Sequence, residues 1–476
     1  MNKLLIGACS LLLCVSASAQ EAWDLRRSVD YALANNISVK QQDIQARLAR
    51  LTYDQSKLSQ YPNLNFSTNF GLNTGRSIDR TTNQFTTATI FYNTFGLQTG
   101  VDVFNFGTKK NTIAAYRLES EAALASVDKL KNDIALNVAG TYLQVLLAKQ
   151  QVDLSRIKLR QTEAQLANTR KLVNAGSVPE LNAAQLEAQL AQDSSNVVTA
   201  KAGEIQALYL MKALLALDAA VPFDVVTPPV GLIPVEPLAD LQPALVYQMA
   251  LQNLPQQRVN SLRLQAANKN VEVARGSMYP SLSANAALQT NYSNSKNQAE
   301  LLGLTPNGFT PIGVVKGTSD TVLAPRFNQN YRFFSTPYGT QLNNNLSKGI
   351  GFGINVPIFN GGSARTAWQR AKLNVKTFEL QQQLDTMTLK QDIYKAYTDA
   401  ITAMEKFNAS TKAVETSAKA FDFAQKRYNI GLLSTIEYLT TQSNLFSAQL
   451  SRSLAQFEYV FKMKVLEFYK GQGLKL

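Results

Sequence analysis

The chain contains no histidine, and its only two cysteines, Cys9 and Cys14, lie within the first 20 of its 476 residues. The lack of histidine excludes Ser-His-Asp triads and most zinc sites. Once the first residues are removed, the chain has no thiol for a disulfide or a cysteine-bound metal. No pair of carboxylates stands at a spacing typical of acid–base catalysis. The sequence therefore predicts no catalytic residue, no cofactor and no metal site.

Long apolar runs are also lacking, because no window of 18 apolar residues follows the first 20 positions, so we expect no transmembrane helix. Residues 1–19 have the pattern of a signal peptide: Lys3 is followed by an apolar stretch, Leu4 to Val15, and then by the small-x-small site Ala17-Ser18-Ala19. We expect this segment to be cleaved. The four residues that end at Cys9 loosely resemble a lipidation signal, which leaves lipidation of Cys9 as an alternative.

The formal net charge is +13, which by itself could indicate a nucleic-acid partner. A secretory signal argues against that partner. The basic residues are also scattered along predicted helices with acidic residues among them, which is typical of a solvated helix face. Examples are Lys129, Lys131, Arg156, Lys158 and Arg160. We predict no nucleic-acid partner and keep lipid headgroups as the functional alternative for these charges.

The sequence contains an internal repeat, and such a repeat bears on the fold of the whole chain. Tyr61-Pro62 recurs 218 positions later as Tyr279-Pro280, and Phe104-Asn105 recurs 255 positions later as Phe359-Asn360. The change of offset places an insertion of 37 residues in the second repeat.

We predict a signal peptide at 1–19, repeat 1 at 20–217, a linker at 218–240, repeat 2 at 241–470 and a tail at 471–476. Each repeat is predicted to hold a helix, two strands, a very long helix and a returning helix.

Four runs alternate between large apolar residues or threonine and small polar residues, at about 63–73, 95–104, 281–292 and 348–358. Since side chains alternate faces along a strand, each run has one apolar and one polar face. Strands of about 9–11 residues suit a tilted crossing of a bilayer. A half-buried sheet of a soluble domain is the alternative, but it would use more valine and isoleucine inside and more charges outside.

Four strands cannot close a barrel, because even the smallest outer-membrane barrels have about eight. Unpaired strand edges are also too costly to face lipid. Several chains must therefore share one barrel. Two chains would supply eight strands and three would supply twelve, and the strand count alone does not decide between them.

Two stretches at 108–175 and 363–430 contain no proline and carry apolar residues at helical spacing. At ~1.5 Å per residue each helix would be about 100 Å long, which requires coiled-coil-like partners. Returning helices are predicted at 178–217 and 434–470. Gly176 and Gly431 are expected to stop the long helices, and Ser177 with Glu180 and Ser434 with Glu437 are expected to form capping boxes.

The ordered combination of repeat, strands, helices and turns resembles the TolC family of outer-membrane efflux ducts over essentially the whole mature length. The turn Arg427 to Leu433 resembles the tip motif of that family closely, and Ala175 to Ser177 resembles it more loosely. The resemblance implies an α+β membrane protein. It would be a homotrimer with a shared 12-stranded β-barrel, four strands per chain, and a long periplasmic α-helical barrel. The resemblance also implies a mixed α/β belt, which we place at 218–240 and the extreme C-terminus.

The resemblance implies that the tips of the helical hairpins form a gate. Mapped from the glycines, the tyrosine of the gate falls on Tyr428, while the arginine position holds Leu433 and the aspartate position holds Asn182. Of two acidic pore positions, Glu437 keeps its charge and Thr440 does not. From the residues alone, Glu437 is also explained as a helix cap and Tyr428 as a packing aromatic.

Tyr61-Pro62 and Tyr279-Pro280 fall where helix gives way to strand, and Phe104 and Phe359 fall at the other strand ends. Proline ends a helix by restricting the residue before it, and aromatic residues suit a membrane interface. Helix-stop chemistry alone is the alternative. Residues 293–345, which hold the insertion, are expected to form a long extracellular loop.

These features predict a passive export duct of the outer membrane for small molecules such as drugs and toxic compounds. With no ATP site, energy must come from an inner-membrane pump reached through a periplasmic adaptor, and the sheet would contact outer-membrane lipid. A type I protein secretion duct is the alternative within the fold. A structural coiled-coil protein of the envelope is the alternative of another class, but it leaves the four alternating runs unexplained.

Overall fold

The computed structural model of the chain describes residues 22–78, 85–227, 235–294 and 298–472. The predicted signal peptide with Cys9, residues 228–234 of the linker and residues 473–476 of the tail lie outside these residues. The chain divides into two compact units. The described part of Met1–Tyr53, Ala115–Asn268 and Lys372–Leu476 forms a helical unit, and Asp54–Ala114 with Lys269–Ala371 forms a strand unit.

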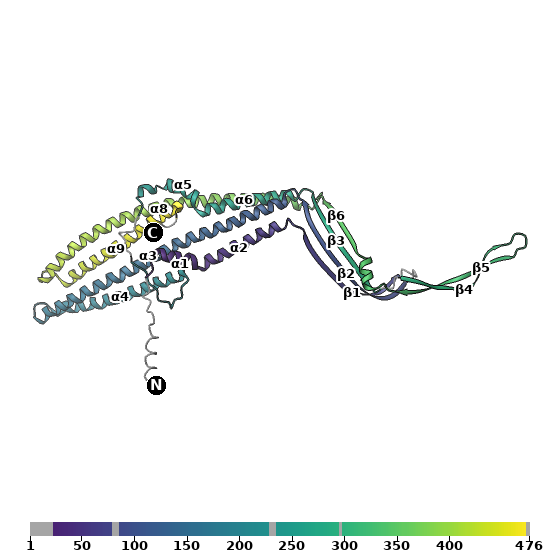
Figure 1. Cartoon of the computed structure of the whole chain (residues 1–476). Helices are drawn as coiled ribbons and strands as arrows, with labels where there is room; N and C mark the ends of the chain where they lie inside the picture. The colour runs from purple at the N-terminus through teal and green to yellow at the C-terminus, as the bar shows by residue number, and fades with distance from the viewer. Residues whose placement is uncertain (1–21, 79–84, 228–234, 295–297, 473–476) are drawn as a thin grey trace, which may run out of the picture. The chain divides into compact units, whose positions relative to one another are not determined.

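Two long helices, α3 and α8, have 67 residues each and turn back into α4 and α9 (Figure 1). The bounds are α3 (Thr108–Asn174), α4 (Glu180–Leu215), α8 (Ser363–Asn429) and α9 (Thr435–Glu467). The shorter helices are α1 (Leu25–Asn35), α2 (Ile37–Leu58), α5 (Pro243–Asn253) and α6 (Pro255–Gly276). No helix within the described ranges has the length and apolar character that a membrane crossing requires.

The helical unit has two apolar cores, each built mainly from one repeat, and Phe457 of α9 also packs in the first. In the first, residues of α1, α3 and α4 pack around Tyr142, Leu146 and Met211. In the second, the 3₁₀ helix η2 (Leu238–Leu241), α5, α8 and α9 pack around Ile393 and Leu466. The short π-helical segment η3 (Phe468–Gln472) follows α9 directly. The equivalent helices of the two sequence repeats therefore form equivalent apolar cores.

Residues 218–227 of the linker pack onto the first core, whereas Val235 and Leu238 pack onto the second. Trp23 and Val225 form a parallel β-bridge. The hydroxyl of Tyr142 donates to the main-chain oxygen of Val226 at 2.6 Å and approaches that of Trp23 at 3.3 Å. Lys149 pairs with Asp224 at 2.5 Å. Burial, followed by the nearby carboxylates of Asp24 and Asp224, raises the pKa of Tyr142, so its hydroxyl stays protonated and remains a donor.

The strand unit holds one four-stranded antiparallel sheet in the order β1-β2-β3-β6. Its strands are β1 (Asn63–Ile78), β2 (Phe85–Phe104), β3 (Ser281–Ser293) and β6 (Ser347–Asn355). β1 and β6 are the edge strands. The two strands of each repeat thus meet the strands of the other repeat at the β2–β3 pair.

The register brings the apolar positions of all four strands onto one face. Phe66 lies opposite Leu97, Leu97 opposite Leu288, and Ala284 opposite Phe352. The other face carries small polar residues such as Asn65, Gly100 and Asn285, which belong to the intervening positions. Within the single chain the apolar face is uncovered, and Ile350 is 83% exposed.

Three strand bounds differ by more than one residue from those expected. β1 reaches Ile78 instead of 73, and β2 begins at Phe85 instead of 95. The added residues include several threonines and isoleucines, whose β-branched side chains favour strands, and they continue the pairing of β1 with β2. β6 ends at Asn355 instead of 358. Pro357 explains the earlier end, since it cannot donate to a strand ladder and restricts the residue before it.

Residues 293–345, which are expected to form a long extracellular loop, contain regular structure among their described residues. They contain a second, two-stranded sheet of β4 (Gln298–Val314) and β5 (Thr321–Phe334), followed by the helix α7 (Tyr338–Asn344). Pro306 and Pro311 belong to β4. In the structure they lie beside β-bulges in an edge strand, where a strand tolerates proline.

Candidate functional site

The two turns at the hairpin tips have the same hydrogen bonds. In the first, the N–H groups of Gly176 and Ser177 donate to the carbonyls of Val173 and Leu172, each at 2.8 Å. In the second, Gly431 and Leu432 donate to Tyr428 and Arg427 at 3.0 and 2.9 Å.

This is the Schellman pattern of a helix end, and it requires a left-handed residue. Gly176 and Gly431 supply it with φ angles of 70° and 74°. The glycines therefore stop both long helices in the same way.

The helices after the turns begin differently. In the second turn, the hydroxyl of Ser434 accepts from the N–H of Glu437 at 3.2 Å, and the Glu437 carboxylate accepts from the N–H of Ser434 at 3.2 Å. This capping box was expected and is present.

The prediction of a capping box at Ser177 and Glu180 is wrong. The N-cap of α4 is Pro179, which makes no side-chain hydrogen bond to the helix. Pro179 places the N-cap of α4 two residues beyond Ser177. The N–H of Ser177 donates to Leu172 at the end of α3.

The acidic and polar positions of the tips are open to solvent. Glu437, Glu180 and Thr440 are exposed. Hydrogen bonds from the Ser434 side chain and main chain lower the pKa of Glu437. The carboxylate of Glu437 is therefore charged at neutral pH while it caps α9. The hydroxyl of Thr440 donates to the carbonyl of Ile436 at 2.8 Å, a bond within its own helix.

Tyr428 connects three helices. Its ring stacks on Tyr438 of α9 with centroids 4.7 Å apart and an interplanar angle of 24°. Its hydroxyl lies 3.2 Å from the hydroxyl of Thr435 and 3.4 Å from that of Thr169 on α3. Tyr428 is 8% exposed, and Thr169 and Thr435 are buried. Burial, followed by the neighbouring Tyr428, raises the pKa of Tyr438 to about 12.

Asn182 and Leu433, which hold the aspartate and arginine positions of the expected gate, are not the partners of Tyr428. Its contact on the first hairpin is Thr169, in α3, whereas Asn182 lies in the first turn of α4 and is half-buried. Leu433, in the position of the arginine, is half-buried in the second turn. At Tyr428 the two hairpins are therefore joined by a pair of neutral hydroxyl groups and not by an arginine and an aspartate.

A buried ion pair inside the first hairpin was missed from the sequence. Asp193 on α4 accepts from Lys158 at 3.1 Å, from Thr162 at 2.8 Å and from Gln189 at 2.9 Å. The side chains of Asp193 and Lys158 are only 1% and 11% exposed. Lys158 also lies 5.2 Å from the Phe446 ring of α9.

The expectation that Lys158 belongs to a solvated helix face is therefore wrong, because the returning helix and α9 cover it. The available signal was the spacing of four between Lys158 and Thr162 and between Gln189 and Asp193, which places each pair on one helix face.

The helix–strand junctions lie in the strand unit. Pro62 and Pro280 directly precede β1 and β3, and Tyr61 and Phe359 are exposed. Phe104 packs edge-on against Phe106 with centroids 4.9 Å apart.

Phe106 also stacks on Tyr279, with ring centroids 4.8 Å apart. Aromatic residues therefore gather at these strand ends.

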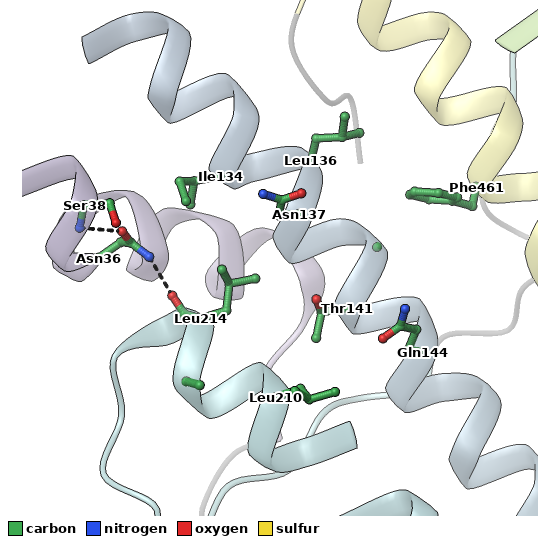
Figure 2. Close-up of a pocket in the computed structure, with 12 residues that line it drawn as sticks. Asn36, Ser38, Ile134, Leu136, Asn137, Thr141, Gln144, Leu210, Leu214 and Phe461 are labelled. Atoms are coloured by element: carbon green, nitrogen blue, oxygen red, sulfur yellow. Dashed lines mark hydrogen bonds between the residues drawn. The ribbon is translucent and has the colours of Figure 1, made fainter. Parts of the chain in front are cut away.

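The helical unit also has an open hollow of about 670 Å³ where α1 meets α2 (Figure 2). Asn36 fixes this junction by accepting from the N–H of Ser38 at 2.9 Å and donating to the carbonyl of Leu214 at 3.0 Å. None of the residues around the hollow carries a charge. In the part of the chain that the structure describes, no group of three or more acidic, histidine or cysteine residues is arranged to hold a metal ion.

Comparison with known proteins gives concordant matches. A family model described as outer membrane efflux protein matches residues 29–216 and 246–462. The probable outer membrane lipoprotein SilC of Salmonella typhimurium is 24% identical over 457 residues, covering 94% of this chain and 85% of SilC.

The cation efflux system protein CusC of Escherichia coli strain K12 is 24% identical over 461 residues, with the same coverage of 94% and 85%. A crystal structure of CusC has a TM-score of 0.76 to this chain at 19% identity, covering 94% and 92% of the two chains.

Proposed function

This chain belongs to the outer membrane efflux protein family, and we propose on that basis that it is the outer-membrane exit duct of a tripartite efflux pump. The resemblance to TolC-like ducts that the sequence indicated is confirmed by this match and by the shared fold. In the proposal, three copies form one trimeric channel that crosses the outer membrane and extends into the periplasm. The role is transport, which needs no catalytic residue.

The observation that supports the proposal most directly is the two-faced sheet with open edges. Its apolar face is uncovered in the single chain, and β1 and β6 have unpaired edges. Backbone groups at an open edge cannot face lipid without a large cost. Three copies joined through β1 and β6 would supply twelve strands and no edges, with the apolar face toward lipid and the small polar face toward the lumen.

Energy for export would come from an inner-membrane pump that reaches the helical tips through a periplasmic adaptor. We propose small molecules as the cargo, since the relative CusC is named a cation efflux protein. A duct for type I protein secretion would use the same fold. A purely structural coiled-coil role leaves the apolar sheet face without a purpose.

We further propose that the tips form the gate of the duct. Tyr428 would hold the second hairpin against the first through Tyr438, Thr435 and Thr169, so the closed state would depend on burial and hydroxyl contacts. Glu437 is exposed next to this contact and charged, so three copies around one axis would favour cations. Gly176, Glu180 and Gly431 would shape the turns that a partner protein meets.

Replacing Glu437 with glutamine is expected to lower the cation selectivity of the channel in a planar bilayer. Glutamine can still accept from the N–H of Ser434, so the cap is largely kept while the charge is lost. Because the pKa of Glu437 is lowered, its charge contributes at all pH values above that pKa and is lost only as the pH falls through it. Wild-type selectivity should therefore persist into mildly acidic solution.

The measurement is the reversal potential under a salt gradient, with Glu180→Gln as the matched control in the first turn. An unchanged reversal potential in the Glu437 variant would reject its place in the pore. Equal shifts in both variants would mean that tip charges act together and not through one ring.

The proposed function as a whole is tested by the mass of the detergent-extracted, unheated particle in native mass spectrometry. A particle of three chains that also conducts ions in a bilayer is the expected result. A monomer, or release of the protein without detergent, would contradict the shared barrel.

A further inference from the structure

The β4–β5 hairpin has two chemically different faces. In the register of this sheet, Leu301 lies opposite Tyr331, Pro306 opposite Phe327 and Pro311 opposite Leu323. Residues that lie opposite one another in a strand pair share a face. The large exposed residues of this face define what we call the apolar hairpin face: Leu301, Leu304, Phe309, Leu323, Phe327 and Tyr331.

The opposite face holds all the charge of the two strands. Glu300 lies opposite Arg332 and binds it at 2.6 Å, and Thr305 lies opposite Asn328. Arg326 falls on the same face by alternation. The apolar hairpin face therefore carries no charged residue over the whole length of β4 and β5.

The hairpin is held firmly at its root. Gln341 of α7 donates to the carbonyls of Ser293 and Thr336, each at 2.8 Å, and accepts from the N–H of Ser293 at 3.0 Å. Ser293 ends β3, and Thr336 follows β5, so one buried side chain ties both legs of the hairpin. Every copy of the chain would present the apolar hairpin face from the same fixed position.

A two-stranded hairpin by itself is at best marginally stable in water, and three or more strands around an apolar face are needed for stability. The face needs a cover. An uncharged surface can meet copies of itself without like-charge repulsion, which favours another copy of this chain as that cover. The hairpin also leads through α7 into β6, the edge strand at which the next copy is expected.

We propose that the three hairpins of one trimer pack through their apolar hairpin faces into a single closed β-structure. This inference rests on the trimer proposed above. It assigns the 37-residue insertion to assembly between copies, at the outer end of the sheet. The charged and amide-rich faces would then be turned to solvent.

The test uses Leu304→Cys and Thr305→Cys, because these neighbours lie on opposite faces of the hairpin. Each variant carries one cysteine once residues 1–19 are removed, since the natural cysteines are at positions 9 and 14. The purified trimer is treated with a short thiol-to-thiol crosslinker and run on a denaturing gel, and the untreated particle is weighed by native mass spectrometry.

A crosslinked dimer for Leu304→Cys, with little or none for Thr305→Cys, is the expected result. Equal yields for the two variants, or no dimer for Leu304→Cys in a particle that still weighs three chains, would overturn the hairpin proposal and leave the trimer intact. Protection of Leu304→Cys from maleimide on intact cells without crosslinking would also overturn it, because another molecule would then cover the face. A particle whose mass is not that of three chains would contradict the proposed trimer itself.

Discussion

Replacing Asp193 with alanine is expected to destabilise the first helical hairpin by about 3–5 kcal/mol. The substitution removes the carboxylate that binds Lys158, Thr162 and Gln189, and it leaves the Lys158 ammonium nearly buried and without its counter-charge. An uncompensated buried charge is costly because the interior cannot replace its hydration. The measurement is the midpoint of thermal unfolding of the helices, followed by circular dichroism in detergent.

A matched control lies on the same two helices. Arg170 and Glu187 also join α3 to α4, at 2.6 Å, but their side chains are 61% and 47% exposed. An exposed pair contributes about 0–1 kcal/mol, so Glu187→Ala should shift the midpoint little. Equal shifts for the two variants would show that the burial of Asp193 does not set its contribution.

A second substitution separates the charge from the hydrogen bonds. Asp193→Asn keeps an acceptor for Thr162 and nearly the same volume, but it removes the counter-charge of Lys158. It should fall between wild type and Asp193→Ala. If Asn and Ala are equally destabilising, the ion pair accounts for the whole effect and the hydroxyl contact for none.

Replacing Tyr428 with alanine is expected to raise the ionic conductance of the isolated channel several-fold. The substitution removes the ring that stacks on Tyr438 and the hydroxyl that meets Thr435 and Thr169, so the second hairpin loses its hold on the first. Deleting a buried aromatic ring usually costs about 3–5 kcal/mol. If this contact stabilises the closed tip, its loss shifts the equilibrium between the closed and the open state toward the open state by the same free energy. Conductance is measured on single channels in a planar bilayer.

Conservative variants distinguish the ring from the hydroxyl. Tyr428→Phe keeps the stacked ring, so it should raise conductance much less than Tyr428→Ala. Thr169→Val removes the partner hydroxyl on α3 with little change in volume. If the two hydroxyls act as one pair, the double variant should conduct no more than either single variant, since coupled residues are not additive.

The control is Tyr394→Ala, which removes a 46% exposed tyrosine from the same helix as Tyr428. It should leave conductance unchanged. A Tyr428→Ala particle that still weighs three chains and conducts like wild type would contradict the gate proposal and would leave Tyr428 as a packing residue only.

The sequence by itself determined the four strands of the main sheet, the two long helices, the two returning helices and the order of these elements. Alternation with a period of two along 63–73 and 281–292 is a local property, and it marks a two-faced strand wherever the chain goes. The absence of proline from 108 to 174 and the glycine at 176 fix the length of α3 in the same local way. The family could be recognised because these local signals occur in a fixed order along the chain.

Pairing between elements was decided only by the tertiary structure. Lys158 has the sequence surroundings of a solvated helix residue, and only the return of α4 and the approach of α9 bury it beside Asp193. Thr169 and Tyr428 are far apart in the chain, and their contact depends on how two long helices lie against each other. β4 contains prolines that a regular central strand would not tolerate, and its bulged pairing with β5 accommodates them. Partner choice is non-local: it depends on the register between distant segments, which no window of the sequence contains.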